Sequence, residues 1–437
     1  MSHYKPYPAY KDSGVDWIGQ VPEHWGAEKL KYIATFAGGG TPSKENADYW
    51  NGSIPWVSPK DMKSEVISDS IDHITPEGLA NSSTKLVNSG AVLLVARSGI
   101  LRHMVPVGIN TAPVSLNQDM KALTLDEGKI RSWFLLRWVQ GLSRSLLFAW
   151  AKQGATVESL EHEYVANSLL PLPDLEEQDA ILSILGRETT CIDALIQKKT
   201  RFIDLLKEKR QALITHAVTK GLNPIVKMKE SGIEWIGQVP EHWEVVPSTW
   251  LFVESKERAH TDDQHLSATQ KYGVIPLAEY ERLEERQVTH AVKNLEQRKH
   301  VELDDFVISM RSFQGGIERV KARGCVRSSY VVLQAGNDAD VNYYTYLFKS
   351  GSYIQGLQAT ASFIRDGQDL NYGNFRQVKL PLPCRAEQQH IADFLDRETA
   401  RIDALMKTTE RSITLLKERR AAFITAAVTG QIDLRGE

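Results

Sequence analysis

Two arginine–serine pairs have side chains that could read a nucleic acid. Arg97-Ser98 follows the apolar run Ala91 to Ala96, and Arg311-Ser312 follows the similar run Asp305 to Met310. Runs of this kind favour buried strands, so each pair is expected at a rigid strand end beside a turn. Arginine presents a planar fork of donors that suits bidentate contact with guanine or phosphate. The two pairs therefore predict contacts to DNA.

Other polar side chains near the two pairs could extend the contact surface. Amides can bind adenine edges, and basic or hydroxyl side chains can bind phosphate. The segment Phe306 to Tyr330 has a local net charge of +4, whereas the whole chain has a net charge of −3. The predicted DNA-contacting residues are Arg97, Ser98, Arg102, Asn117, Gln118, Arg311, Ser312, Gln314, Arg319, Lys321, Arg327 and Ser329.

An internal repeat organises the chain around these side chains. The segment Ser13 to Trp25, which ends in Pro-Glu-His-Trp, recurs as Ser231 to Trp243 with a shift of 218 residues. A second block, Leu170 to Thr219, recurs as Leu380 to Thr429 with a shift of 210 residues and 28 identities in 50 positions. Chance does not produce this agreement, so the chain is a tandem duplication.

The repeated segments predict the domain boundaries. Two variable segments, 26–169 and 244–379, combine short apolar runs with turn residues and a few helical stretches, which predicts α/β or α+β domains. The other predicted parts are the first repeated motif (1–25), a central helix (170–222), a linker with the second motif (223–243), and a distal helix with a tail (380–437).

The second repeated block predicts a long helix in each half. No proline occurs between Pro173 and Pro224 or after Pro383, and the apolar residues alternate at spacings near three and four, as in a coiled coil. Forty-odd helical residues would form a rod of about 60 Å. We expect the two helices to pair antiparallel within the chain, while a bundle with another subunit stays open. The predicted seam and docking positions are Leu185, Ile192, Leu195, Phe202, Leu206, Leu213, Leu395, Ile402, Leu405, Leu416 and Phe423.

Recognisable catalytic motifs are absent from the sequence. There is no G-x-x-x-x-G-K-[ST] phosphate loop, H-E-x-x-H zinc helix or G-x-S-x-G nucleophile elbow. Pro240-Glu241 with Glu254-Ser-Lys256 loosely fits the spacing of metal-dependent nucleases, but the first copy of the repeat has no equivalent, so we interpret it as chance. His24 and His242 are interpreted as structural residues beside a tryptophan. The twelve histidines do not cluster at metal-ligand spacing, so no catalytic residue, metal ligand or bound cofactor is predicted.

Composition restricts the class of protein further. The 437 residues are 42% hydrophobic and 24% charged, which excludes a wholly disordered chain. No apolar run is long enough to span a bilayer, and the N-terminus has no apolar secretory segment. Cys191, Cys325 and Cys384 stand far apart, which argues against a disulfide framework or a zinc cage. Together these features predict a multidomain protein of the cytoplasm.

In its motifs and their order, the chain resembles the specificity subunit of type I restriction–modification systems. The resemblance rests on the paired Ser-Gly-x-x-Trp-Ile-Gly-Gln-Val-Pro-Glu-His-Trp motifs and on the two Leu-Pro-Leu-Pro…Ile-Asp-Ala-Leu…Leu-Leu-Lys-Glu blocks. The first variable segment adds Gly39-Gly-Thr-Pro-Ser43, Tyr49-Trp-Asn-Gly-Ser-Ile-Pro-Trp-Val57 and Asn117-Gln-Asp119, which are similar to a target-recognition domain. The second variable segment lacks the first two signatures, so its assignment rests on position and on Arg311-Ser312.

The resemblance implies a non-catalytic subunit with two target-recognition domains separated by two long α-helices, which form an antiparallel coiled coil with pseudo-twofold symmetry. Each domain would bind one half of a bipartite, asymmetric site in double-stranded DNA, and the helices would set the spacer. Two methyltransferase subunits would dock on the helices, and motor-nuclease restriction subunits would join them. S-adenosylmethionine, ATP and Mg²⁺ would be bound by those partners. Two alternatives stay open: a duplicated coiled-coil scaffold without DNA reading and, less favoured, a stand-alone metal-dependent nuclease.

Overall fold

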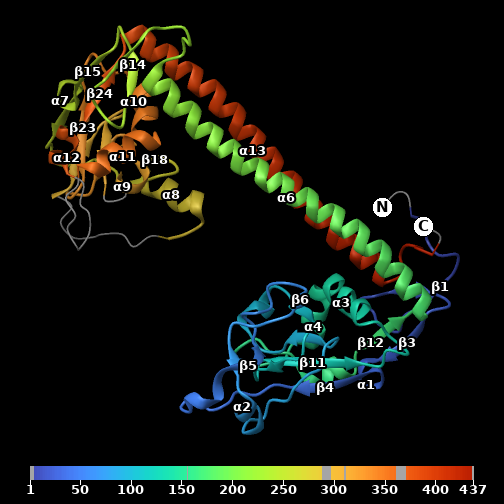
Figure 1. The fold of residues 1–437 in the computed structure, drawn as a ribbon. Coiled ribbons are helices and arrows are strands. Elements are labelled where there is room, and N and C mark those ends of the chain that lie inside the picture. Colours follow the sequence, from blue (N-terminus) through green and yellow to red (C-terminus); the bar gives the residue numbers. More distant parts are fainter. Residues whose placement is uncertain (1–3, 155, 288–296, 310–311, 361–370, 436–437) are drawn as a thin grey trace. The chain divides into compact units, whose positions relative to one another are not determined.

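A computed structural model describes residues 4–154, 156–287, 297–309, 312–360 and 371–435. The chain divides into two compact units, each of which holds one variable segment and parts of both long helices (Figure 1). Unit 1 comprises residues 1–199 and 411–437, and unit 2 comprises residues 200–410. Among the described residues, every helix is too short or too polar to cross a bilayer.

Unit 1 is built on a five-stranded sheet in the order β4-β11-β8-β9-β6. Neighbouring strands are antiparallel except β9 and β6, which are parallel. A smaller three-stranded sheet has the order β10-β5-β7. The strands are β4 (Ala34–Gly38), β5 (Trp50–Val57), β6 (Val66–Ile67), β7 (His73–Ile74), β8 (Val92–Val95), β9 (Val107–Asn110), β10 (Ser115–Leu116) and β11 (Met120–Leu125).

Strand β8 is buried on both faces, and its side chains alternate between two cores. Val92 and Leu94 belong to a cluster with the helices α3 (Ser132–Gly141) and α4 (Ser143–Trp150), whereas Leu93 and Val95 belong to a cluster with residues of the small sheet. A strand buried on both faces reads as a continuous apolar run, as Ala91 to Ala96 does. The prediction of a buried strand delivering Arg97 is confirmed.

Unit 2 repeats the central part of this arrangement with a four-stranded antiparallel sheet in the order β16-β23-β20-β21. Two further pairs, β17-β18 and β19-β22, extend the unit. The strands are β16 (Phe252–Ser255), β17 (Leu266–Thr269), β18 (Gly273–Pro276), β19 (Lys299–Val301), β20 (Phe306–Ile308), β21 (Glu318–Arg319), β22 (Gly324–Val326) and β23 (Val331–Ala335), and the longer helices are α8 (Leu277–Glu284), α10 (Val341–Phe348) and α11 (Gly351–Ala359).

The repeated motifs close each variable segment at its base. In unit 1, β3 (Gly26–Lys29) leads into the segment and pairs antiparallel with β12 (Leu169–Leu172), which leads out of it. In unit 2, β15 (Glu244–Pro247) pairs with β24 (Lys379–Leu382) in the same way. The Leu-Pro-Leu-Pro motif is therefore itself an exit strand. Hairpins β1–β2 (Tyr10–Asp12, Gln20–Pro22) and β13–β14 (Met228–Glu230, Gln238–Pro240) precede the two segments.

Paired contacts explain why the two kinds of motif recur together. Trp25 and Trp243 are fully buried. His24 Nε2 lies 2.8 Å from Glu177 Oε2 in unit 1, and His242 Nε2 lies 2.9 Å from Glu387 Oε2 in unit 2. Each histidine of Pro-Glu-His-Trp thus meets the glutamate at the start of a long helix. These contacts agree with the structural role predicted for both histidines.

Both long helices are present and run antiparallel to each other (Figure 1). They are α6 (Leu175–Lys220) and α13 (Arg385–Val428). Within unit 1, Arg420 Nε lies 2.9 Å from Asp193 Oδ1, and within unit 2, Arg210 Nε lies 3.2 Å from Asp403 Oδ1. Symmetric ion pairs of this kind are expected when two copies of one helix pack against each other. The predicted antiparallel coiled coil is confirmed.

The predicted seam is only partly correct. The buried predicted positions are Leu185, Ile192, Leu206, Leu395, Ile402 and Phe423, while Leu213 and Leu416 are partly buried. Leu195, Phe202 and Leu405 are 42%, 45% and 44% exposed, so assigning them to the seam was wrong. Three residues turn a helix by about 300°, which is about 60° short of a full turn. Two side chains three residues apart therefore point in directions about 60° apart around the helix axis. A two-helix pair buries a narrow face, and these residues lie on its flank.

The shorter helices join other elements within each unit. In unit 1 they are α1 (Leu30–Ile33), η1 (Ala47–Tyr49), α2 (Pro76–Ala80), η2 (Gly99–Arg102) and α5 (His162–Ala166). In unit 2 they are α7 (Ser248–Leu251), α9 (Ser312–Gly315) and α12 (Tyr372–Gln377). Several begin at a side-chain cap, as expected for helices too short to be stable without tertiary contacts.

An ion-pair network in unit 1 predicts acid sensitivity. Glu65 Oε1 accepts hydrogen bonds from Arg137 Nη1 at 2.7 Å and Arg420 Nη2 at 3.3 Å. Burial acts to raise the pKa of Glu65, but the hydrogen bond and charge of Arg137 outweigh it, so its pKa lies below the usual value. The stability it contributes is therefore present above the ordinary glutamate pKa and is lost as the pH falls through the lowered pKa.

Replacing this carboxylate should lower the melting temperature of unit 1 at neutral pH but not in acid. We expect Glu65→Gln to lower it by about 2–4 °C at pH 7, the shift that ~1 kcal/mol produces in a unit of this size. The difference from the wild type should shrink in acid, as the pH falls through the lowered pKa of Glu65 and this carboxylate becomes protonated. Thermal melts at several pH values would measure this, with the exposed Glu127→Gln as control; an equal loss at every pH would contradict the ionic role.

Candidate nucleic-acid interface

Four of the five predicted residues of unit 1 converge on one cavity. Arg97, Ser98, Asn117 and Gln118 all line a pocket of about 1090 Å³. They meet because β8 and β11 are hydrogen-bonded neighbours, so the end of one strand lies beside the turn that precedes the other. The remaining lining residues are Thr41, Lys44, Trp50, Trp56, Ser58, Pro59, Lys60, Asp72, Asp119 and Val157.

An ion pair holds the Arg97 guanidinium at the pocket. Its Nε lies 2.6 Å from Asp119 Oδ1, and the backbone N–H of Arg97 donates to the carbonyl of Asp119 at 3.1 Å. The Arg97 side chain is 53% exposed, and no hydrogen bond from its terminal nitrogens is found among the described residues. The fork is thus oriented while its terminal donors stay available for an acceptor such as guanine or phosphate.

Asn117 and Gln118 are fixed by the same turn. Asn117 Oδ1 accepts from the backbone N–H of Asp119 at 3.0 Å, and its Nδ2 lies 3.4 Å from the Asp119 carboxylate. The Thr41 hydroxyl donates to Gln118 Oε1. Gly39 permits this close packing, because a Cβ there would lie 1.9 Å from the carbonyl oxygen of Asn117. The Gly-Gly-Thr-Pro and Asn-Gln-Asp motifs, which are far apart in the sequence, therefore pack against each other at this pocket.

Two tryptophans form an aromatic wall of the pocket. The rings of Trp50 and Trp56 lie 5.1 Å apart and nearly perpendicular. Trp56 Nε1 donates to the carbonyl of Gly40 at 2.9 Å, which ties the wall to the glycine loop. Lys44 and Lys60 add positive charge at the same cavity. The candidate list from the sequence missed these four side chains, although each lies within or beside the quoted glycine and tryptophan motifs.

Arg102 lies apart from this group. It is not among the residues that line the pocket, and its Nε lies 2.5 Å from Glu158 Oε1. The hydrogen bond from Arg102 holds the pKa of Glu158 below its usual value. Ser98, in contrast, lines the pocket while its hydroxyl caps η2 by accepting from the Ile100 N–H at 3.4 Å.

The predicted residues of unit 2 are more dispersed. Arg311 lies outside the described residues. Ser312 is fully buried, and its hydroxyl accepts from the Ser309 N–H at 2.9 Å, which is a structural role. Gln314, Arg327 and Ser329 are exposed but do not line the cavity that Arg319 and Lys321 line. The direct DNA contacts assigned to this set stay predictions.

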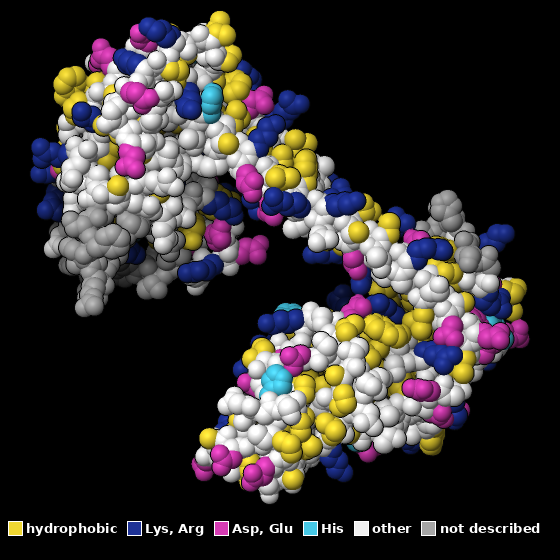
Figure 2. Space-filling model, in the orientation of Figure 1, with side chains coloured by type: hydrophobic (Ala, Val, Ile, Leu, Met, Phe, Trp, Pro, Cys, Tyr) yellow, Lys and Arg dark blue, Asp and Glu magenta, His cyan; other side chains and the backbone are white. Residues whose placement is uncertain are grey.

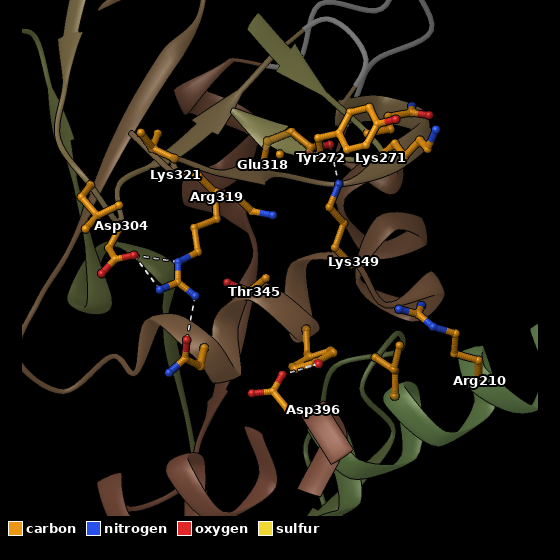
Figure 3. Close-up of a pocket in the computed structure, with 17 residues that line it drawn as sticks. Arg210, Lys271, Tyr272, Asp304, Glu318, Arg319, Lys321, Thr345, Lys349 and Asp396 are labelled. Carbon is orange, nitrogen blue, oxygen red and sulfur yellow. Dashed lines mark hydrogen bonds and ion pairs between the residues drawn. The ribbon is translucent and has the colours of Figure 1, made fainter. Parts of the chain in front are cut away.

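A basic cavity of about 830 Å³ does occur in unit 2 (Figure 3). Its cationic lining residues are Arg210, Lys271, Arg319, Lys321 and Lys349. Arg319 is engaged by Asp304, at 2.8 and 2.5 Å from Nε and Nη2, and by Asn342 Oδ1 at 2.7 Å. Lys349 pairs with Glu318, a carboxyl whose pKa is raised by burial. The arginine and this lysine therefore stabilise the unit, and Lys321 is a freer cation.

The nuclease interpretation gains no structural support. Glu241 forms an ion pair with Lys227 at 2.9 Å, and Glu254 lies 3.8 Å from Lys256. Neither glutamate belongs to the groups of described residues that could hold a metal ion. Such groups do form around His260 in unit 2, where they include His300, which is 40 positions distant. Sequence spacing could not show this proximity, because strand pairing creates it.

Hydrophobic side chains remain exposed along the long helices (Figure 2). They include Leu195, Phe202, Leu205, Leu405 and Leu415. Leu195 and Leu405 are equivalent positions of the repeat, and so are Leu205 and Leu415. Contiguous exposed apolar patches mark contact sites for other proteins, whereas singly scattered apolar side chains are ordinary on protein surfaces.

Comparison with known proteins gives a consistent result. A family model for the type I restriction modification DNA specificity domain matches residues 22–202 and 240–415. The specificity subunit of the type I restriction enzyme EcoR124I/EcoR124II from Escherichia coli is 33% identical over 202 residues, 46% of this chain and 47% of the relative. That alignment thus spans less than half the length of the relative.

Two other similarities extend over nearly the whole chain. The type I restriction enzyme MjaX specificity subunit of Methanocaldococcus jannaschii is 22% identical over 96% of both chains. A solved chain from a study of complex assembly and conformational transition of the type I R-M system has a TM-score of 0.68 at 15% identity, covering 93% of this chain and 98% of its own. This last similarity concerns the fold.

Proposed function

Since the chain belongs to the family of the type I restriction modification DNA specificity domain, we propose that each of its two units binds one half of a split, asymmetric DNA sequence. The observation that carries the proposal is the unit 1 pocket, where Arg97, Asn117 and Gln118 converge beside two tryptophans. Arginine and amide side chains are the groups that distinguish guanine and adenine in the major groove. The chain itself is non-catalytic and acts in the cytoplasm.

The repeated motifs and the two long helices, together called the frame, support a bipartite site. Two similar frames, joined by α6 and α13, carry two variable segments of different sequence. Unlike domains on a repeated frame would read unlike half-sites, and the helices would set the length of the unread spacer. Each correctly read base pair contributes about 1–3 kcal/mol of discrimination. Linked readers gain further selectivity because the second binding event becomes intramolecular.

The partners follow from the same proposal. Two methyltransferase subunits dock along the helices, where the exposed leucines recur at equivalent positions of the repeat, and motor-nuclease restriction subunits join that complex. A pair of equivalent faces suits two copies of one partner. S-adenosylmethionine, ATP and Mg²⁺ are bound by these partners. This chain supplies the sequence selectivity.

Mapping modified adenines across the genome tests the proposal. Cells that co-express this chain and its methyltransferase partner should carry methylation at one split, asymmetric motif, and that methylation should disappear when the chain is omitted. Methylation without any chain-dependent motif, despite a stable complex with an active methyltransferase, would contradict DNA reading. That outcome would favour the scaffold interpretation.

A further inference from the structure

A cluster of histidine and carboxylate side chains in unit 2 lies outside the cavities described above. We call Glu257, His260, Asp263, His300 and Glu302 the histidine cluster. The first three lie on the loop between β16 and β17, and the last two lie on or just after β19. Ligand atoms of Glu257, His260 and His300 all lie within 4.8 Å of one another. We propose that this cluster binds a transition-metal ion of the Zn²⁺ class.

The two imidazole rings are held together. The rings of His260 and His300 stack with their centroids 4.2 Å apart and an interplanar angle of 14°. The His300 side chain is only 3% exposed, whereas that of His260 is 42% exposed. One ring is therefore fixed in the interior, and the other lies at the surface, where an ion could enter.

Hydrogen bonding fixes the buried histidine in an orientation suited to a ligand. His300 Nδ1 lies 2.7 Å from Asp263 Oδ2, and a carboxylate there accepts the Nδ1 proton. A carboxylate bound to the far nitrogen of a metal-ligating histidine is the usual supporting arrangement. In a neutral ring Nε2 is then an acceptor, yet it faces Glu302 Oε1 at 3.0 Å. Two facing acceptors need a proton or a metal ion between them.

A second observation also points to a cation at this cluster. The Asp263 side chain has no exposed surface, and its Oδ1 atom has no hydrogen-bond partner among the described residues. A buried, unpaired carboxylate oxygen is costly unless positive charge lies close to it. Arg323 supplies positive charge to this region. Its Nη1 lies 3.1 Å from Asp262 Oδ2, and its Nε lies 3.3 Å from Glu302 Oε1. Four carboxylates, those of Glu257, Asp262, Asp263 and Glu302, lie in this region.

The ligand types define the class of ion. Imidazole with carboxylate suits Zn²⁺ and its neighbours in the first transition series, whereas Mg²⁺ and Ca²⁺ prefer sites of oxygen ligands alone. When His260 binds the ion through its other ring nitrogen, Nδ1 carries the ring proton. Arg323 Nη2, which lies 3.3 Å from Nδ1, must then move away from it. The ion would fasten the 257–263 loop to β19. This inference does not depend on the proposed DNA function.

Metal titration of the full-length, tag-free chain tests the site. After treatment with a chelator, the wild type should bind one equivalent of Zn²⁺, measured by competition with a chromophoric chelator, and its melting temperature should rise with the ion. His260→Ala should weaken binding at least tenfold, and Asp263→Asn by about 10–100-fold because the supporting carboxylate is lost. His103→Ala, which removes an exposed histidine in unit 1, should bind as the wild type does.

Two results would overturn the proposal. One is a wild-type chain that binds no stoichiometric Zn²⁺; the gap between His300 and Glu302 would then be filled by a proton. The other is His260→Ala that binds the ion as tightly as the wild type. Melting curves without metal separate either result from misfolding, because a substitution at the half-exposed His260 should leave the metal-free melting temperature within a few degrees of the wild type.

Discussion

Arg97→Ala should reduce discrimination at one half of the target by about 5- to 150-fold and leave the other half unchanged. The range corresponds to the ~1–3 kcal/mol that a bidentate arginine–base contact contributes. Arg97 is the predicted side chain whose guanidinium is oriented by Asp119 and whose terminal nitrogens have no partner among the described residues. Methylation of a set of sites with single base changes in each half would measure the effect.

Two companion variants sharpen this experiment. Arg97→Lys keeps the charge but loses the planar fork, so we expect an intermediate loss of selectivity. Arg144→Ala removes an exposed arginine on α4, outside the pocket, and should leave selectivity unchanged. Equal loss at both half-sites in Arg97→Ala, with normal stability, would rule out separate readers in the two units.

Leu206→Glu should disrupt the pairing of α6 and α13 and abolish assembly with the methyltransferase. Leu206 is only 7% exposed, so the substitution places a carboxylate in an apolar seam. Burial of an unpaired charge costs several kcal/mol, which is comparable to the whole stability of many domains. The helix signal in circular dichroism should disappear at a clearly lower denaturant concentration than in the wild type.

Leu205→Glu provides a matched control for this substitution. It makes the same chemical change one position earlier on the same helix, but Leu205 is 45% exposed. Surface substitutions usually change stability by less than about 0.5 kcal/mol. The two variants should therefore differ strongly in their unfolding midpoints. Similar midpoints would mean that the seam described here does not hold the helices together.

The frame of this protein was more predictable than its sites. The repeats at Ser13 and Leu170, with the absence of proline, were enough to predict the duplication and the antiparallel helices. The exposure of Leu195 and Phe202 was not predictable, because heptad spacing alone does not say how wide a face the partner helix covers. Periodicity identifies an element, whereas burial depends on its neighbour.

Recognition residues were predictable only where strand order brought them together. Arg97 and Asn117 were identified separately, and the pairing of β8 with β11 placed them at one pocket. In unit 2, the same reasoning selected Ser312, which the fold buries, and Arg319, which Asp304 engages. His260 and His300 were not identified, since their proximity depends on a loop folding over β19. Local sequence patterns do not predict such long-range contacts.

The paired strands at the base of each variable segment make it exchangeable. A segment enters through β3 or β15 and leaves through the adjacent strand β12 or β24, so its two ends lie side by side on the repeated frame. A foreign segment with the same end strands can be inserted without stretching the frame, since domain insertions are tolerated where the ends of the inserted segment are close together. Recombination at these two strand pairs would then create a new specificity in a single genetic event, while the helices and their partners stay the same.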